Sequence, residues 1–247
     1  MRLASNEHVR YRDPMTAEPP PAPRSRRERP AKPALTRDGI IATAVDVMRA
    51  EGLDRVTMRR LSQELDTGPA SFYVYFRNTA ELHAGILDEL LAEVDLNPAR
   101  TDGPWRDRVA AVLTSYLAVL IEHPSLARSA LVARPSGAHY LDLVEVLLAL
   151  MSEGKVAPER AAWAVDLLLQ YATATAAEQS AHRRSIDSQD EWDALAAALH
   201  GASPERHPHI AALGDDLLSG TSRARLTWGF QVLIAGLEAA PAPDTAG

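Results

Sequence analysis

The chain has 247 residues, of which 46% are hydrophobic, 5% aromatic and 24% charged, and its formal net charge is −7. This length can hold one large domain or two smaller ones, and the abundance of Ala and Leu favours helices. Because the chain has no cysteine and no apolar run near the ~20 residues of a membrane span, we expect no disulfide, no membrane partner and a cytoplasmic location.

The charge is unevenly distributed along the chain. The first 80 residues carry more Lys and Arg than Asp and Glu, whereas acidic residues predominate in the rest. A cationic front on an anionic body indicates that only the front meets a polyanion.

Residues 1–33 lack helical periodicity and include the stretch EPPPAPRSRRERPAKP, which predicts a flexible, extended arm. Residues 24–37 hold six basic side chains and one acidic one. This segment is either a solubilising tail or an arm that lies along phosphate and releases counterions.

The first predicted helix begins near Thr36. An apolar stripe runs from Ile40 to Met48, and Gly52 ends the pattern. The segment VTMRRLSQEL then predicts a second helix with Thr57 as its N-cap.

A tight turn follows at Asp66, Thr67 and Gly68, and Pro69 suits the first position of a new helix. Two short helices joined by such a turn, after a longer helix, indicate a helix-turn-helix.

Four aromatic residues follow the turn. In a helix that starts near Pro69, Phe72 and Phe76 share one face and are expected to close a small core. Tyr73 and Tyr75 point elsewhere and are candidates for contact with phosphate.

Residues 105–240 are predicted to form longer helices. One follows Trp105 until Pro124, and the segments YLDLVEVLLALM, AAWAVDLLLQYATATAA and RLTWGFQVLIAGLEAA are apolar almost all round, as in helices buried on several sides. Residues 182–209 are polar and are interpreted as a loose insert around one short helix near Trp192.

At this point the chain resembles the TetR family of transcriptional regulators. The resemblance covers about residues 36–95 and is carried by LTRDGIIATAVDVMRAEGLDRVTMRRLSQELDTGPASFYVYFRNTAELHAGIL. It extends weakly through GPWRDRV, VARPSG and GFQVLIAGLEA, which look like the ligand domain of the tetracycline repressor. It implies an all-α fold with an arm at 1–33, a helix-turn-helix DNA-binding domain at 34–80, and a helical ligand-binding and dimerisation domain at 81–247.

The resemblance also implies roles for single residues. Arg59 matches a position that often reads guanine, although a solvated helix charge is the alternative. Tyr73 matches a phosphate-contacting position, with a core role as its alternative. The implied DNA-binding set is Arg37, Thr57, Arg59, Arg60, Thr67, Gly68, Pro69, Ala70, Ser71, Tyr73, Tyr75 and Thr79.

The turn, Tyr75 and Thr79 depart from the family pattern. Tyr75 stands where a histidine is common before the last aromatic residue. The turn begins with Asp66, which adopts the left-handed conformation at some cost, and Gly68 is a poorer N-cap than Ser. Thr79 stands where a lysine usually opens the fourth helix, at about residues 79–95. Thr79 can cap that helix, but one positive charge is missing.

For the body, the resemblance implies a homodimer in which helices at about 159–181 and 222–240 pair with their copies. It also implies a mostly apolar pocket for a small-molecule effector. The expected lining is Leu113, Tyr116, Leu117, Leu131, Tyr140, Val144, Leu147, Trp163, Leu167, Gln170 and Tyr171, each of which could equally be plain core. Ala130 replaces the metal-binding histidine of the tetracycline repressor, so magnesium-chelated tetracycline is not the expected effector.

The predicted function is therefore that of a repressor, released from a palindromic operator on double-stranded DNA by a small, largely apolar molecule. An enzyme is not expected, because the phosphate-loop, Gly-x-Ser-x-Gly and His-Glu-x-x-His motifs are absent. No cofactor or metal is expected either, although His200, His207 and His209 lie close together in sequence. A helical interaction module that does not bind DNA remains the alternative.

Overall fold

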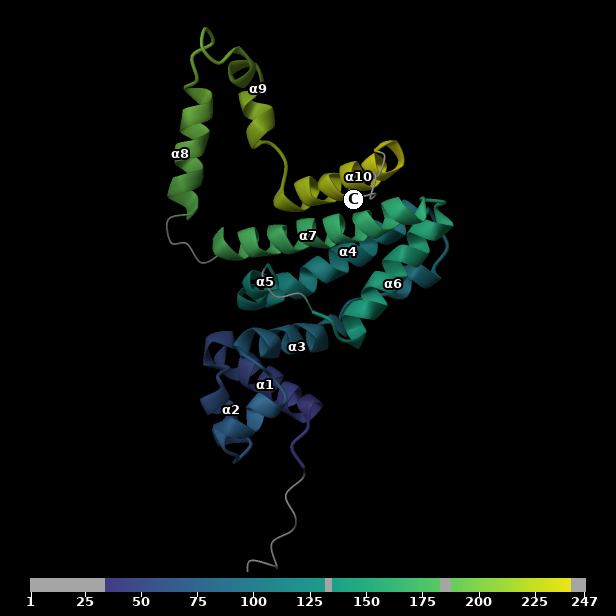
Figure 1. Cartoon of the computed structure of the whole chain (residues 1–247). Coiled ribbons are helices and arrows are strands. Elements are labelled where there is room, and N and C mark those ends of the chain that lie inside the picture. The colour runs from purple at the N-terminus through teal and green to yellow at the C-terminus, as the bar shows by residue number, and fades with distance from the viewer. Residues whose placement is uncertain (1–33, 132–134, 183–187, 241–247) are drawn as a thin grey trace, which may run out of the picture. The chain divides into compact units, whose positions relative to one another are not determined.

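The computed structural model describes residues 34–131, 135–182 and 188–240, and every regular element in these ranges is a helix (Figure 1). The all-α prediction is thus confirmed for the described residues. These elements belong to one unit, residues 35–247. Their bounds are α1 Arg37–Glu51, η2 Leu53–Arg55, α2 Met58–Glu64, η3 Pro69–Val74, α3 Thr79–Leu91, η4 Asn97–Arg100, α4 Trp105–Glu122, α5 Pro124–Ala130, α6 Ala138–Glu153, α7 Pro158–His182, α8 Ser188–His200, α9 Pro208–Leu218 and α10 Ser222–Ala239.

Local sequence signals fix the ends of the first helices. The Thr36 hydroxyl accepts a hydrogen bond from the Gly39 amide at 3.1 Å and begins α1. Gly52 ends it with φ of +90°, a conformation that favours glycine. Helix α3 is capped by Asn78, whose side chain accepts from the Glu81 amide, so the expected cap at Thr79 is wrong by one residue.

The segment after the turn is a short 3-10 helix, η3, rather than an α-helix. Gly68 precedes it without a side-chain cap, and Pro69 occupies its first turn. Phe72 and Phe76 are fully buried, as expected, while Tyr73 is 62% exposed. The two phenylalanines therefore anchor η3 to the core, and the side of η3 that carries Tyr73 is open to solvent.

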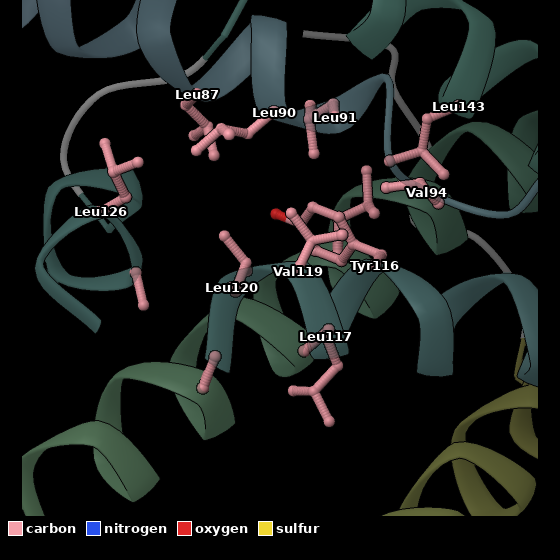
Figure 2. Packing of buried hydrophobic residues seen from close by; sticks show 14 of the residues in the cluster. Leu87, Leu90, Leu91, Val94, Tyr116, Leu117, Val119, Leu120, Leu126 and Leu143 are labelled. Atoms are coloured by element: carbon pink, nitrogen blue, oxygen red, sulfur yellow. The ribbon is translucent and has the colours of Figure 1, made fainter. Parts of the chain in front are cut away.

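The body is built around α4, which contacts α3, α6, α7 and α10. Figure 2 shows leucines of α3 facing apolar side chains of α4, with Leu126 of α5 beside them. Leu87, Leu90 and Leu91 of α3 and Leu120 of α4 are all buried. Helix α3 also packs on α1, so it contacts both the helix-turn-helix and the body.

The region after α7 is more helical than the sequence indicated. Within the supposed loose insert, α8 spans 13 residues, and α9 follows at Pro208–Leu218. These two helices pack on each other, and Trp192 and Leu195 of α8 and Leu213 of α9 are about half exposed. The helix predicted near Trp192 is thus present as α8, and the unpredicted α9 begins where the segment ends, at Pro208.

Among the described helices, none is by itself long and apolar enough to cross a membrane. Helices α4 and α5 reach that length only as a pair, and they are bent by 115° relative to each other.

Candidate nucleic-acid interface and body cavity

The exposed side of the helix-turn-helix is formed by α2, the turn and η3. The Thr57 hydroxyl caps α2 by accepting from the Arg60 amide at 3.1 Å, as predicted. Asp66 has φ of +45°, so the turn does place a non-glycine residue in the left-handed region. Gly68 has φ of −77°, which any residue can adopt, and an added Cβ would meet no neighbouring atom within 4 Å.

Most of the predicted DNA-binding residues are accessible. Eight are exposed: Arg37, Thr57, Arg59, Gly68, Pro69, Ala70, Tyr73 and Thr79. Four are half-buried: Arg60, Thr67, Ser71 and Tyr75. Val74, next to Tyr73, is 81% exposed on the same segment and was not among the predicted contacts, because an apolar side chain gives no signal for a polar contact. The arm at 1–33 lies outside the described residues.

The two neighbouring arginines of α2 differ in their surroundings. No described residue forms a hydrogen bond or ion pair with Arg59. Arg60 instead binds Glu51 at 2.6 Å and Glu64 at 2.7 Å. Its hydrogen bond holds the pKa of Glu51 below the usual value, and the two carboxylates raise the pKa of Arg60. Arg59 is therefore available for a base or phosphate, whereas Arg60 would have to share its guanidinium.

The aromatic residues after the turn divide in a similar way. The Tyr75 hydroxyl donates to the carbonyl of Leu35 and so ties the start of α1 to the end of η3. The Arg37 guanidinium lies over the Phe76 ring, 5.2 Å from its centre. This cation–π contact holds the Arg37 side chain beside the helix-turn-helix. Tyr73 has no such contact among the described residues, so its hydroxyl faces solvent.

The body contains a small cavity of about 110 Å³ between α4, α5, α6 and α7, and it opens to solvent beside the exposed Leu131, Asp166 and Gln170. Four of the predicted pocket residues line it: Tyr116, Leu131, Tyr140 and Gln170. The wall also includes Ala130, Pro135, Asp166, Leu169 and Thr173. Drug-sized ligands occupy roughly 300–1,000 Å³, so a molecule of that size would have to widen this cavity.

The other seven predicted residues lie elsewhere. Leu113, Leu117 and Leu147 belong to the buried core, and Val144 is half-buried beside it. Tyr171 packs edge-to-face on Phe230, with ring centres 5.5 Å apart. Trp163 and Leu167 are exposed on α7, at 55% and 44%. Helical periodicity identifies buried faces, but it does not tell which buried residues border a void.

Two hydroxyl groups of the cavity wall are hydrogen-bonded to each other. The Thr173 hydroxyl donates to the Leu169 carbonyl at 2.8 Å, so it accepts from the Tyr116 hydroxyl, also at 2.8 Å. Burial raises the pKa of Tyr116 to about 12, and the tyrosine stays a neutral donor at physiological pH. Asp166 and Gln170 add an acid and an amide to the same wall.

Possible metal ligands are sparse in the part of the chain that the structure describes. His200 lies 3.0 Å from Asp215, and it forms no metal-like group with His207 or His209. Glu93, Glu122 and His123 do come together, but Glu93 is already paired with Arg49 at 2.6 Å. Ala130 in the cavity wall offers no ligand atom.

Comparisons with known proteins agree along most of the chain. Residues 40–86 match the family described as "Bacterial regulatory proteins, tetR family", and residues 97–240 match "Tetracyclin repressor-like, C-terminal domain". The chain is 30% identical over 220 residues to the HTH-type transcriptional repressor DrrR1 of Streptomyces coeruleorubidus, which covers 86% of this chain and 81% of that protein.

Solved structures are similar over comparable lengths. The Streptomyces transcription regulator SCO7704 is 53% identical with a TM-score of 0.73, covering 87% of this chain and 100% of that one. The TetR family protein ActR of Streptomyces coelicolor, in complex with actinorhodin, is 34% identical with a TM-score of 0.73 and the same coverage. The chain therefore belongs to the tetR family of bacterial regulatory proteins and is a ligand-responsive, DNA-binding transcriptional regulator.

Proposed function

We propose that this protein is a homodimeric repressor that reads a palindromic operator through α2 and η3. The observation that carries the proposal is the difference in burial among the aromatic residues after the turn. Phe72 and Phe76 are buried in the core, whereas the Tyr73 side chain is 62% exposed. Arg59 reads a guanine, and Tyr73 reaches a phosphate from the same surface. Pro69 and Ala70 allow the backbone of η3 to come close to the base edges.

Two copies pair through α7 and α10. Both helices expose large apolar side chains, with Trp163 at 55% on α7 and Trp228 at 66% on α10. Val232 is 47% exposed one turn after Trp228. A monomer gains nothing from these side chains, whereas a two-fold dimer buries them and presents two η3 segments to two half-sites.

The effector is a flat, largely apolar molecule with polar edges. The cavity combines Leu131, Leu169 and Pro135 with the hydroxyls of Tyr116 and Tyr140 and the amide of Gln170. Such a wall suits a ring system that carries carbonyl or hydroxyl groups. ActR, which binds actinorhodin, supports this class of ligand. The cavity widens to admit it, and the binding energy of the effector drives a body conformation with lower DNA affinity.

The first experiment selects bound fragments from a random DNA pool with the full-length protein at moderate salt. We expect enrichment of an inverted repeat. Arg59→Ala should then weaken binding by roughly 1–3 kcal/mol and relax the choice of one base pair. Arg55→Ala is the matched control, because Arg55 is exposed and pairs with Glu51 outside the proposed surface. Equal losses in both variants, or no enriched sequence, would refute the proposed reading.

The dimer and the effector are tested separately. Trp228→Glu should shift the protein from dimer to monomer in sedimentation and abolish operator binding without loss of helicity. Actinorhodin serves as the probe ligand, and we expect it to quench tryptophan fluorescence and release the operator. A dimer that survives Trp228→Glu would contradict the assigned interface.

A further inference from the structure

Helix α3 is joined to the wall of the cavity by one carboxylate. Asp88, on α3, accepts a hydrogen bond from the backbone amide of Tyr140 at 2.9 Å. Tyr140 lies in the first turn of α6 and lines the cavity. Figure 1 shows α3 and α6 as neighbours, and the two helices are in contact. One polar contact thus connects the helix that packs on α1 with the helix that borders the cavity.

Asp88 supplies an N-terminal cap that α6 lacks in its own sequence. Gly137 precedes α6 and makes no side-chain capping hydrogen bond. The first amides of a helix need acceptors, and a carboxylate there also opposes the positive end of the helix dipole. Asp88 provides both from a different helix, and its side chain is only 15% exposed.

The surroundings are shaped to hold this carboxylate. A Cβ atom on Gly137 would overlap the Asp88 carboxyl group, so only glycine leaves room for it at this position. The φ of Gly137 is −88°, which any residue can adopt, so the glycine is required for space. The buried Nδ1 of His139 lies 3.6 Å from the other carboxyl oxygen of Asp88, beyond hydrogen-bond distance.

We propose that Asp88 is the positioning residue that couples the conformation of the cavity wall to the position of the DNA-binding helices. The inference rests on the proposed function and names a residue that carries its regulation. An effector larger than the cavity displaces Tyr140, and with it the first turn of α6. Asp88 transmits that displacement to α3, and α3 passes it to α1, on which it packs. The buried Leu87, Leu90 and Leu91 of α3 also transmit strain, but their packing is not directional, whereas the hydrogen bond links one atom of α3 to one atom of α6.

A second carboxylate contact on α6 provides a matched control. Glu153, the last residue of α6, binds the guanidinium of Arg108 on α4. Arg108 also donates to the carbonyl of Thr101 at 3.1 Å. This contact ties α6 to α4 and the preceding loop, with no bond to α3. Loss of either carboxylate weakens one end of α6, but only loss of Asp88 should affect communication with α3.

The test uses operator DNA as the ligand, because coupling between two sites is reciprocal. Hydrogen exchange of the first turn of α6 is measured with and without the selected operator. In the wild-type protein we expect operator binding to change the exchange rate of the Leu141 amide by at least about 5-fold. This amide donates to the Gly137 carbonyl at 3.2 Å, an acceptor that the substitution of Asp88 leaves in place. In Asp88→Ala the change should fall below about 2-fold, while Asp88→Asn, which keeps an acceptor oxygen, should retain part of it. Glu153→Ala should behave like the wild type.

A disulfide offers a reversible second test, since the chain has no cysteine of its own. A Cβ on Gly137 would lie less than 3.0 Å from the Asp88 carboxyl carbon, which is one bond of ~1.5 Å from the Asp88 Cβ. The two Cβ atoms are therefore within the ~4.5 Å reach of a disulfide. In Asp88→Cys/Gly137→Cys we expect the oxidised protein to show the operator-dependent change and the reduced protein to lose it.

The outcomes separate the two proposals. If no sequence is enriched from the DNA pool, the proposed function and the role of Asp88 fall together. If an operator is found but leaves the exchange of α6 unchanged, or changes it equally in Asp88→Ala, only the role of Asp88 is overturned. The same holds if oxidation of the cysteine pair has no effect.

Discussion

The hydrogen bond between Tyr116 and Thr173 predicts an asymmetry between two conservative substitutions. Thr173→Val removes the acceptor of a tyrosine hydroxyl that is 3% exposed in the wild-type protein. Tyr116→Phe removes the donor but leaves the Thr173 hydroxyl bonded to the Leu169 carbonyl. The first change leaves the buried Tyr116 hydroxyl without an acceptor, whereas the second leaves no buried donor unpaired. We therefore expect Thr173→Val to destabilise the fold more.

The magnitudes follow from what each variant leaves behind. An unsatisfied buried hydroxyl costs about 1–3 kcal/mol, whereas the net loss of a neutral hydrogen bond costs about 0.5–1.5 kcal/mol. The double variant lacks both hydroxyls and leaves nothing unpaired. Its cost should be close to that of Tyr116→Phe and well below the sum of the two single changes.

Urea unfolding of the four proteins, followed by circular dichroism at one protein concentration, measures these differences. The concentration must be fixed because dimer formation adds to the apparent stability. A sum of single effects equal to the double effect would mean that the two hydroxyls do not interact. Equal costs for the two single variants would contradict the predicted asymmetry, because they would mean that loss of Thr173 does not leave the Tyr116 hydroxyl unpaired.

Three further predictions concern pH, the helix ends and the small core. The pKa of Tyr116 rises from an ordinary value of 10.0 to about 12, so its stabilisation is complete below pH 10. It should be lost between about pH 10 and 12, by up to ~2.7 kcal/mol, and Tyr116→Phe should flatten that part of the stability–pH profile. Gly52→Ala should lower the free energy of unfolding by about 1–2 kcal/mol, because Gly52 has φ of +90° and alanine is strained there. An added Cβ would meet no atom within 4 Å, so a clash does not contribute. An unchanged midpoint of urea unfolding would contradict the assigned backbone strain. Phe72→Ala should lower the free energy of unfolding by about 3–5 kcal/mol, whereas Tyr73→Ala should leave it unchanged and weaken only operator binding; thermal melts and DNA titrations separate the two, and equal melting shifts would contradict the assigned burial.

The sequence predicted the helix-turn-helix well because its signals are local. Thr36, Gly52 and Thr57 each act on their own helix through one short contact, so their roles could be inferred from spacing alone. The failures also have local causes. Asn78 and Thr79 are both good capping residues, and the choice depends on backbone angles that the sequence does not show. Helix α9 was missed because it is short and because it begins at Pro208, between two histidines, in a stretch whose composition suggests a loop.

The cavity was only partly predictable, for a different reason. Leu113 and Tyr116 both follow the apolar stripe of α4, yet only Tyr116 borders the void. Thr173 was overlooked because a polar residue on an apolar helix suggests a solvent-facing position, and Asp166 does face solvent although it borders the cavity. Their place in the wall depends on how α7 is rotated against α4 and α6, which is a property of packing between helices.

The contacts around α3 differ in what they can specify. On the side of α1, Ile86 and Leu82 of α3 are buried, and the exposed Arg49–Glu93 ion pair nearby adds little stability. On the side of the body, the buried Leu87, Leu90 and Leu91 stabilise the contact through apolar packing, which has no preferred direction of its own. A hydrogen bond is directional and weakens steeply when its angle closes. The Asp88–Tyr140 contact therefore sets the register of α3 against α6, and a small displacement at the cavity moves α3 as a body or breaks that bond.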